Sequence, residues 1–149
     1  KEKDYTKVLD LSKAWLEKCP VDAEVHFMRG QALIAQGDIA HYSMELYYFY
    51  GLVTSITSSG DGTSEKTAFK LISPEEENFV LSDFGAEPTG QTMEGTCDIV
   101  RCKVNDGKGG EKEVTYYFDI SISIAAEAKQ FEHNKTGGGS PAPARGGGN

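Results

Sequence analysis

The stretch that decides the fold is EVTYYFDISISI, residues 113–124. Every second side chain is apolar, from Val114 to Ile124, and the residues between them are mostly polar. Alternation of this length is typical of a β-strand with one face buried and the other in water. It predicts a strand over the whole of residues 113–124.

Residues 97–104 alternate in the same way and lead into a turn sequence, NDGKGG, at 105–110. A further short strand is expected at 69–72, while 86–95 is expected to be a loop and 125–131 a final short helix. These strands predict a small antiparallel sheet. After the strand at 69–72, Ser73-Pro74 followed by Glu75, Glu76 and Glu77 is a typical helix start. The three glutamates are expected to form a solvated first turn rather than a pair of catalytic carboxylates.

The first 58 residues predict helices over 5–18, 23–36 and 39–56, from apolar side chains spaced three or four apart. They resemble a tetratricopeptide array of one and a half repeats, with Gly30 as the small residue and Gly37 at the turn. His26 and Arg29 depart from that pattern, which has an aromatic residue and a leucine there. Such a fragment cannot bury its own apolar faces. We therefore expect strand 113–124 to cover them, with Phe49 near Phe118.

These patterns predict an α+β domain over residues 1–135. It consists of a tetratricopeptide-like helical hairpin and a third helix at about 4–57, packed on a small antiparallel β-sheet at about 68–124. Residues 136–149, TGGGSPAPARGGGN, have no large apolar side chain and are expected to be a flexible tail or linker.

The formal charge of −8 argues against partners that present a phosphate backbone or an anionic membrane surface. No apolar run approaches the roughly 20 residues that span a bilayer, so neither nucleic-acid binding nor membrane insertion is expected. Cys97 and Cys102 are five apart in one strand and so lie on opposite faces, which makes a disulfide between them unfavourable. The cysteines and histidines form no zinc or catalytic motif. We expect no cofactor and no catalytic residue.

A family resemblance rests on SSGDGT at 58–63, on Thr67-Ala68-Phe69 and on the closing Tyr117-Phe118-Asp119-Ile120. With the helices before them, these residues resemble a Bacteroidetes family, domain of unknown function 4919, over about residues 4–124. The resemblance implies an extracytoplasmic location, in the envelope or secreted, because members typically carry a signal peptide. It implies no activity.

Two stretches are candidate sites. In SSGDGT, Asp61 together with Glu65 supplies two acidic groups for calcium or a small ligand, or the glycines simply let the chain turn. In Tyr47-Tyr48-Phe49-Tyr50, aromatic rings point to all sides of a helix. Either that helix is covered on several faces, or Tyr47 and Tyr50 lie on an exposed patch that binds a protein partner.

The function we expect is a non-catalytic protein-interaction or scaffold domain within a secreted or surface assembly. The alternative is a small-ligand or calcium-binding domain that uses the SSGDGT loop.

Overall fold

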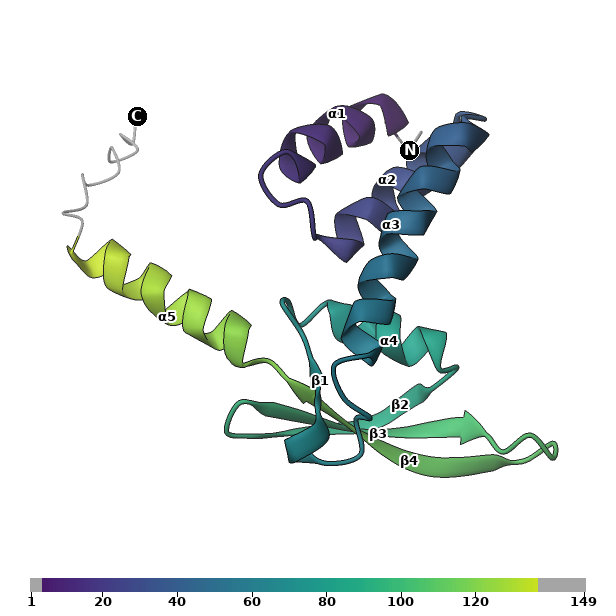
Figure 1. Cartoon of the computed structure of the whole chain (residues 1–149), viewed down its shortest axis with the longest axis vertical. Coiled ribbons are helices and arrows are strands. Elements are labelled where there is room, and N and C mark those ends of the chain that lie inside the picture. The colour runs from purple at the N-terminus through teal and green to yellow at the C-terminus, as the bar shows by residue number, and fades with distance from the viewer. Residues whose placement is uncertain (1–3, 137–149) are drawn as a thin grey trace, which may run out of the picture.

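A computed structural model of the chain describes residues 4–136 and places three helices at one end and a sheet at the other (Figure 1). The helical end consists of α1 (Tyr5–Leu16), α2 (Ala23–Ala35) and α3 (Ile39–Thr57). All three were expected within two residues of their observed bounds. The sheet end contains four strands and two further helices, which confirms the α+β class.

Each of the first three helices begins with an aspartate whose carboxylate accepts a backbone hydrogen bond. Asp4 accepts from Lys7, Asp22 from Val25 and Asp38 from His41, at N–O distances of 3.0, 3.0 and 3.2 Å. These bonds satisfy amide groups that a helix cannot satisfy itself. The starts of the helices are therefore fixed by short-range sequence.

The second half begins with a 3₁₀ turn, η1 (Glu65–Thr67), and continues with β1 (Phe69–Lys70), α4 (Glu76–Asp83), β2 (Glu87–Glu94), β3 (Cys97–Asn105) and β4 (Glu111–Asp119). The strand order is β1-β4-β3-β2. Strands β2, β3 and β4 form an antiparallel meander, whereas β1 pairs parallel to β4. The sheet is thus mixed, and the expectation of a purely antiparallel sheet is wrong at β1.

The strand expected over residues 113–124 ends early. The last residue of β4, Asp119, pairs with Cys97, the first residue of β3, and with Lys70, the last residue of β1. Beyond this point no strand offers backbone partners. The chain turns into α5 (Ser121–Thr136) instead, and the Asp119 carboxylate accepts the Ser121 N–H at 2.9 Å. The alternation of serine and isoleucine after Asp119 was therefore wrongly assigned to the strand.

Strand β2 occupies residues expected to be a loop. Its sequence, EPTGQTME, is exposed almost throughout, so it has no apolar alternation to reveal it. It lies at the sheet edge, and its register with β3 is irregular between Pro88 and Gly90. Proline and glycine are tolerated at such an edge.

Helix α4, not strand β4, connects the helices to the sheet. Its Phe79 packs on Phe49 of α3, with ring centroids 5.1 Å apart, whereas Phe118 of β4 packs on Phe69 of β1 at 5.8 Å. From α3, Ile56 reaches the main core under the sheet. The expected contact between Phe49 and Phe118 is therefore wrong, because α4 fills the space between the helices and the sheet.

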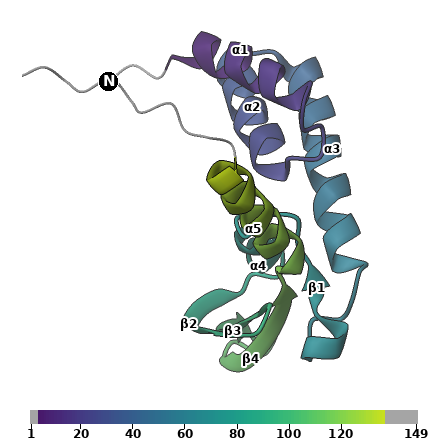
Figure 2. The ribbon, with the colours of Figure 1, turned by 90° about the vertical axis from the view of Figure 1, so that its left-hand side faces the viewer.

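Helix α5 extends from the end of β4 and is mostly exposed (Figure 2). Thr136, placed in the tail by composition, is its last residue. The rest of the expected tail, 137–149, lies outside the described residues. Among residues 4–136, no helix is long and apolar enough to cross a membrane.

Candidate functional site

The aromatic stretch on α3 leaves all three of its tyrosines exposed to water. Tyr47 is 78% exposed and Tyr50 is 52% exposed, whereas Phe49 is 8% exposed and packs on α4. Tyr48 is 47% exposed. The sequence left open whether Tyr47 and Tyr50 are covered, and the structure leaves both accessible.

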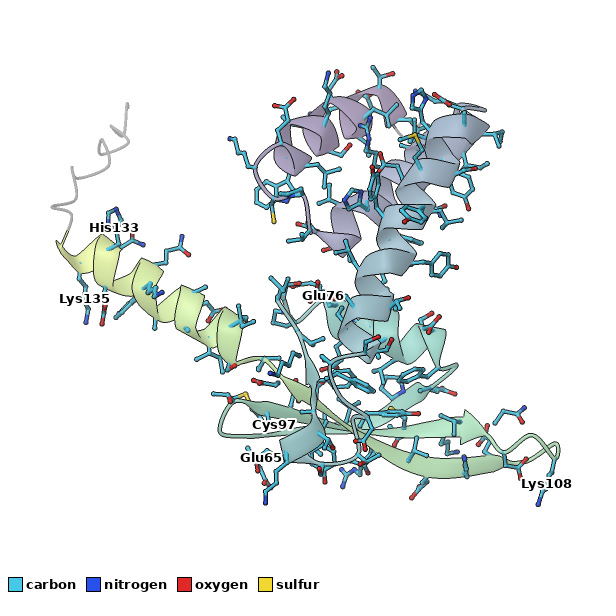
Figure 3. The ribbon with its side chains drawn as sticks, in the orientation of Figure 1. Glu65, Glu76, Cys97, Lys108, His133 and Lys135 are labelled. Atoms are coloured by element: carbon cyan, nitrogen blue, oxygen red, sulfur yellow. The ribbon has the colours of Figure 1, made fainter. Side chains whose placement is uncertain are left out.

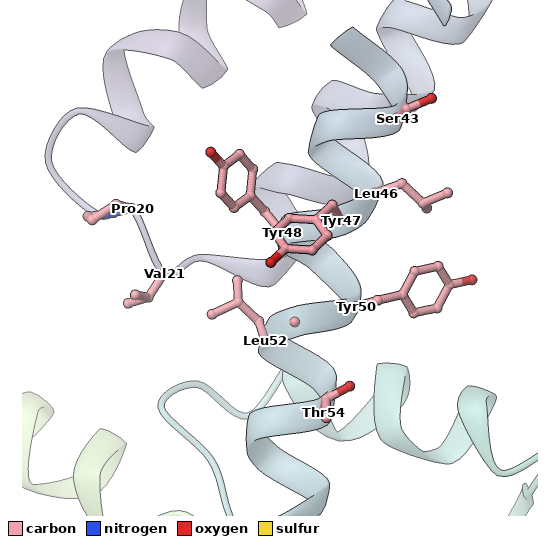
Figure 4. A pocket seen from close by; sticks show the side chains of 10 residues that line it. Pro20, Val21, Ser43, Leu46, Tyr47, Tyr48, Tyr50, Leu52 and Thr54 are labelled. Atoms are coloured by element: carbon pink, nitrogen blue, oxygen red, sulfur yellow. The ribbon is translucent and has the colours of Figure 1, made fainter. Parts of the chain in front are cut away.

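These tyrosines border a groove of about 760 Å³, which we call the tyrosine groove (Figure 4). Its lining residues are Pro20, Val21, Ser43, Leu46, Tyr47, Tyr48, Tyr50, Gly51, Leu52 and Thr54. None of them carries a charged side chain. Figure 4 shows Tyr48 and Leu52 on the side of α3 that faces the loop at Pro20, and Tyr50 on the opposite side. The groove therefore offers apolar surface edged by hydroxyl groups.

A buried polar cluster holds the wall of the tyrosine groove. His26 of α2 is 7% exposed, and its Nδ1 lies 2.6 Å from Oε2 of Glu45 on α3. Its Nε2 lies 3.0 Å from the carbonyl oxygen of Pro20. Both ring nitrogens of His26 therefore lie within hydrogen-bond distance of an oxygen atom. The ring of Tyr48 packs on His26 at 5.2 Å. The cluster thereby holds the loop at Pro20 and the Tyr48 face of α3 against α2.

Arg29 completes this cluster and ties α1 to it. Its Nε donates to Oε1 of Glu45 at 2.9 Å, and its Nη1 donates to the carbonyl oxygen of Leu9 at 2.8 Å and to Oγ of Ser12 at 3.2 Å. The Glu45 carboxylate thus receives hydrogen bonds on both oxygens. Since a charge in a half-buried place is stable only when it is paired, these contacts account for polar residues where the repeat pattern has apolar ones.

Sequence reasoning did not find this cluster. His26 and Glu45 are 19 positions apart, and no motif links them. The available signal was the departure of His26 and Arg29 from the tetratricopeptide pattern. Two polar replacements three residues apart lie on one face of a helix, which indicates a common acidic partner on a neighbouring helix.

The carboxylate of Asp61 is occupied within its own loop. Its Oδ1 accepts from the backbone N–H of Thr63 at 2.9 Å and from the Thr63 hydroxyl at 2.8 Å. Hydrogen bonds from Thr67 and Thr63 lower the pKa of Asp61. The loop is also joined to the sheet, because Gly62 donates to the Thr67 carbonyl and accepts from the Tyr117 N–H. These contacts give the loop a structural role at the start of β1.

Glu65 lies in η1 and is exposed, near Cys97 (Figure 3). Burial, and to a smaller extent the Glu65 carboxylate, raise the pKa of the Cys97 thiol. Within residues 4–136, no three histidine, cysteine or acidic side chains come together as a metal site would need. The structure therefore does not add a third ligand to Asp61 and Glu65.

The first turn of α4 is buried rather than solvated, which corrects the expectation for two of its three glutamates. Glu76 is 4% exposed and Glu77 is 8% exposed, whereas Glu75 is exposed. The Glu76 carboxylate accepts the N–H groups of Ile72 and Ser73, at 2.7 and 3.2 Å. The bond to Ser73 is the half of the capping box that the sequence indicated. α4 lies against the sheet, and this contact takes Glu76 and Glu77 out of water.

The cysteines are free thiols. Cys97 and Cys102 are both buried in β3, which agrees with the expectation that they do not pair. Burial raises the pKa of the Cys102 thiol, and the nearby Glu77 carboxylate adds to this effect.

Comparison with known proteins assigns the family. The model of domain of unknown function 4919 (DUF4919) matches residues 1–129, and the chain belongs to this family. No curated protein and no solved structure is similar enough to the chain to count as a match. The family resemblance read from SSGDGT and the closing strand is thereby confirmed.

Proposed function

We propose that this member of the family is a non-catalytic interaction domain that binds a segment of another protein in the tyrosine groove. The observation that carries the proposal is the exposure of Tyr47 and Tyr50 beside an uncharged groove of about 760 Å³. Tyrosine is enriched at protein interfaces because it buries a large area at a small entropic cost and its hydroxyl still forms hydrogen bonds. Large exposed apolar patches commonly mark such interfaces.

The lining of the groove defines the chemistry of the partner. Leu46, Leu52 and Val21 offer apolar contacts, while the hydroxyls of Ser43 and Thr54 offer hydrogen bonds at the edge. A charged side chain would lose its hydration there without gaining an ion pair. The segment that fits is therefore uncharged where it enters the groove. Since the chain carries a net charge of −8, basic residues on either side of that segment favour association.

The groove is preorganised for such a role. His26 anchors the carbonyl of Pro20, and the indole N–H of Trp15 donates to the Asp22 carboxylate at 2.7 Å just after the groove-lining loop. A wall held in place loses less conformational freedom on binding than a mobile one. The same hydrogen bonds occupy both nitrogens of His26, so this histidine is not offered to a substrate. This supports an interaction role over a catalytic one.

We place this interaction outside the cytoplasm, in the envelope or in a secreted assembly. That part of the proposal rests only on the location that the family resemblance implies.

The proposal is tested by selecting peptides from a displayed library on the whole chain and measuring the affinity of the enriched peptides. We expect Tyr47→Ser and Tyr50→Ser each to weaken binding about tenfold or more, as truncation of a central aromatic contact does. Phe131→Ser is the matched control, because Phe131 is an exposed aromatic residue on α5 (62%), outside the groove. Enriched peptides that bind both tyrosine variants as tightly as the unmodified chain would show that the groove is not the binding site.

A further inference from the structure

The packing of α4 on β3 brings the Glu77 and Asp98 side chains into interaction. Glu77 of α4 is 8% exposed and Asp98 of β3 is 9% exposed. One oxygen of Asp98, Oδ2, accepts a hydrogen bond from the Gln91 side chain of β2. Its other oxygen, Oδ1, is buried and has no hydrogen-bond partner among residues 4–136. A buried carboxylate oxygen without a hydrogen-bond donor lowers the stability of the fold. A donor close to Oδ1 would remove this penalty.

Protonation of Glu77 supplies the missing donor. Two ionised carboxylates in contact repel each other, whereas an acid and a carboxylate form a strong hydrogen bond. We propose that Glu77 and Asp98 share one proton and that this shared proton makes the attachment of α4 to the sheet sensitive to pH. Burial, together with the neighbouring Asp98 carboxylate, raises the pKa of Glu77 from 4.5 to about 7.

No other charged group is needed to account for this pair. From β3, Cys102 also faces Glu77, and Tyr116 of β4 lies near that thiol. From β2, Gln91 is neutral. On α4 itself, the Glu76 carboxylate is held by two backbone N–H groups, and α3 contributes apolar side chains to the two clusters that include α4 residues. Among residues 4–136, no lysine, arginine or histidine side chain forms an ion pair with Glu77 or Asp98.

The position of α4 gives this proton a long-range effect. On one side, Val80 and Leu81 are part of the main core under the sheet. On the other side, Phe79 packs between Phe27 and Phe49 of the helical end. The packing there is incomplete, because a groove of about 460 Å³ runs between α2, α3 and α4. Loss of the proton would loosen α4 and, through Phe79, weaken the attachment of α1–α3 to the sheet.

The direction of the pH effect follows from the raised pKa. Between pH 4.5 and about 7, the folded protein keeps the Glu77 proton that the unfolded chain has released. The folding equilibrium constant therefore falls as pH rises through this range, by at most tenfold per pH unit, and stops falling above it. Partial access of water makes the measured fall smaller than this limit.

The test measures two quantities between pH 5 and 8: the free energy of unfolding, from urea titrations, and the hydrogen-exchange protection of the α4 amides. In the unmodified chain we expect both to fall up to about pH 7 and then to level off. Glu77→Gln keeps the shape of the side chain and a hydrogen-bond donor but removes the titrating carboxyl group. It should therefore remove the pH-dependent loss of stability and of α4 protection. Glu75→Gln changes an exposed glutamate on the same turn and should leave the fall intact.

Two results would overturn the proposal. One is the same pH dependence in Glu77→Gln as in the unmodified chain. The other needs no variant and decides the question even if Glu77→Gln does not fold. The Glu77 carboxyl carbon of the unmodified chain is followed by NMR, and a titration midpoint near 4.5 would show that no proton is retained. A midpoint near 7, with loss of α4 protection over the same range, supports the proposal.

Discussion

The SSGDGT loop, which lies between α3 and β1, packs closely against Phe69. Gly62→Ala therefore tests the structural role of this loop directly. Gly62 has a φ of +65°, a conformation that costs an L-residue about 1–2 kcal/mol. A Cβ atom there would lie 2.1 Å from Cε2 of Phe69. The Phe69 ring is 3% exposed and packs against Phe84 and Phe118, so it cannot move aside cheaply. Such overpacking costs about 1–3 kcal/mol more.

Two further variants separate these costs. Gly107→Ala meets the same conformational penalty, because Gly107 has a φ of +73°, but no atom lies within 4 Å of its added Cβ. Gly60→Ala does the reverse, since Gly60 does not have a positive φ but its Cβ would lie 2.2 Å from the carbonyl oxygen of Thr67. We expect losses in the free energy of unfolding of about 2–5 kcal/mol for Gly62→Ala and about 1–2 kcal/mol for Gly107→Ala.

The assay is urea unfolding followed by far-UV circular dichroism, with all variants under one set of conditions. Effects of alanine on the unfolded chain are similar at the three positions and cancel in the differences. The reasoning is refuted if Gly62→Ala and Gly107→Ala lose the same stability within about 0.5 kcal/mol. That result would mean that the loop is not packed against Phe69.

Three further predictions concern the contact of α4 with α2 and α3, the polar cluster around His26 and the start of α5. Phe79→Ala removes ring contacts with α2 and α3 and should lower the free energy of unfolding by about 2–4 kcal/mol, measured in urea. Glu45→Ala removes the carboxylate that bonds to both Arg29 and His26 and should cost about 2–3 kcal/mol in the same assay, whereas Tyr47→Ser at an exposed position should cost less than about 0.5 kcal/mol. Hydrogen bonds from Ser121 lower the pKa of Asp119. The protection of the first α5 amides against hydrogen exchange should therefore fall as pH drops below about 4, and Asp119→Ala should remove this dependence.

The helical end could be predicted from the sequence because its determinants are local. Aspartate caps, apolar side chains three or four apart and a glycine after α2 act within a few residues of one another. The sheet end depends on partners that are distant in the chain. Strand β4 stops at Asp119 because its partners end there, β1 at its last residue, Lys70, and β3 at its first residue, Cys97, and nothing in the residues after Asp119 marks that limit. Strand β2 is held to β3 by backbone pairing and by side-chain hydrogen bonds from Thr89 and Gln91, and it carries no apolar pattern.

The same distinction explains what the sequence said about the candidate site. Helical periodicity places Tyr47 and Tyr50 on faces of α3, but it does not say which neighbouring element covers each face. The answer depends on α4, which covers Phe49 and leaves the tyrosines exposed. Glu77 and Asp98 lie in different elements, and their contact follows from the packing of α4 on β3. A run of three glutamates therefore gave no sign that two of them are buried.

The tyrosine groove and the acid pair are connected through one helix. Tyr50 borders both the tyrosine groove and the smaller groove between α2, α3 and α4, which Phe79 also lines. The buried cluster of Ala23, Phe49 and Val53 is packed by Leu46, Leu52 and Phe79, and of these three only Phe79 comes from α4. Loosening α4 at the Glu77–Asp98 pair would thus remove support from the side of α3 that carries Tyr50. The two proposals together predict that peptide binding in the tyrosine groove weakens as pH rises to about 7 and then levels off, and that Glu77→Gln makes the affinity independent of pH over this range.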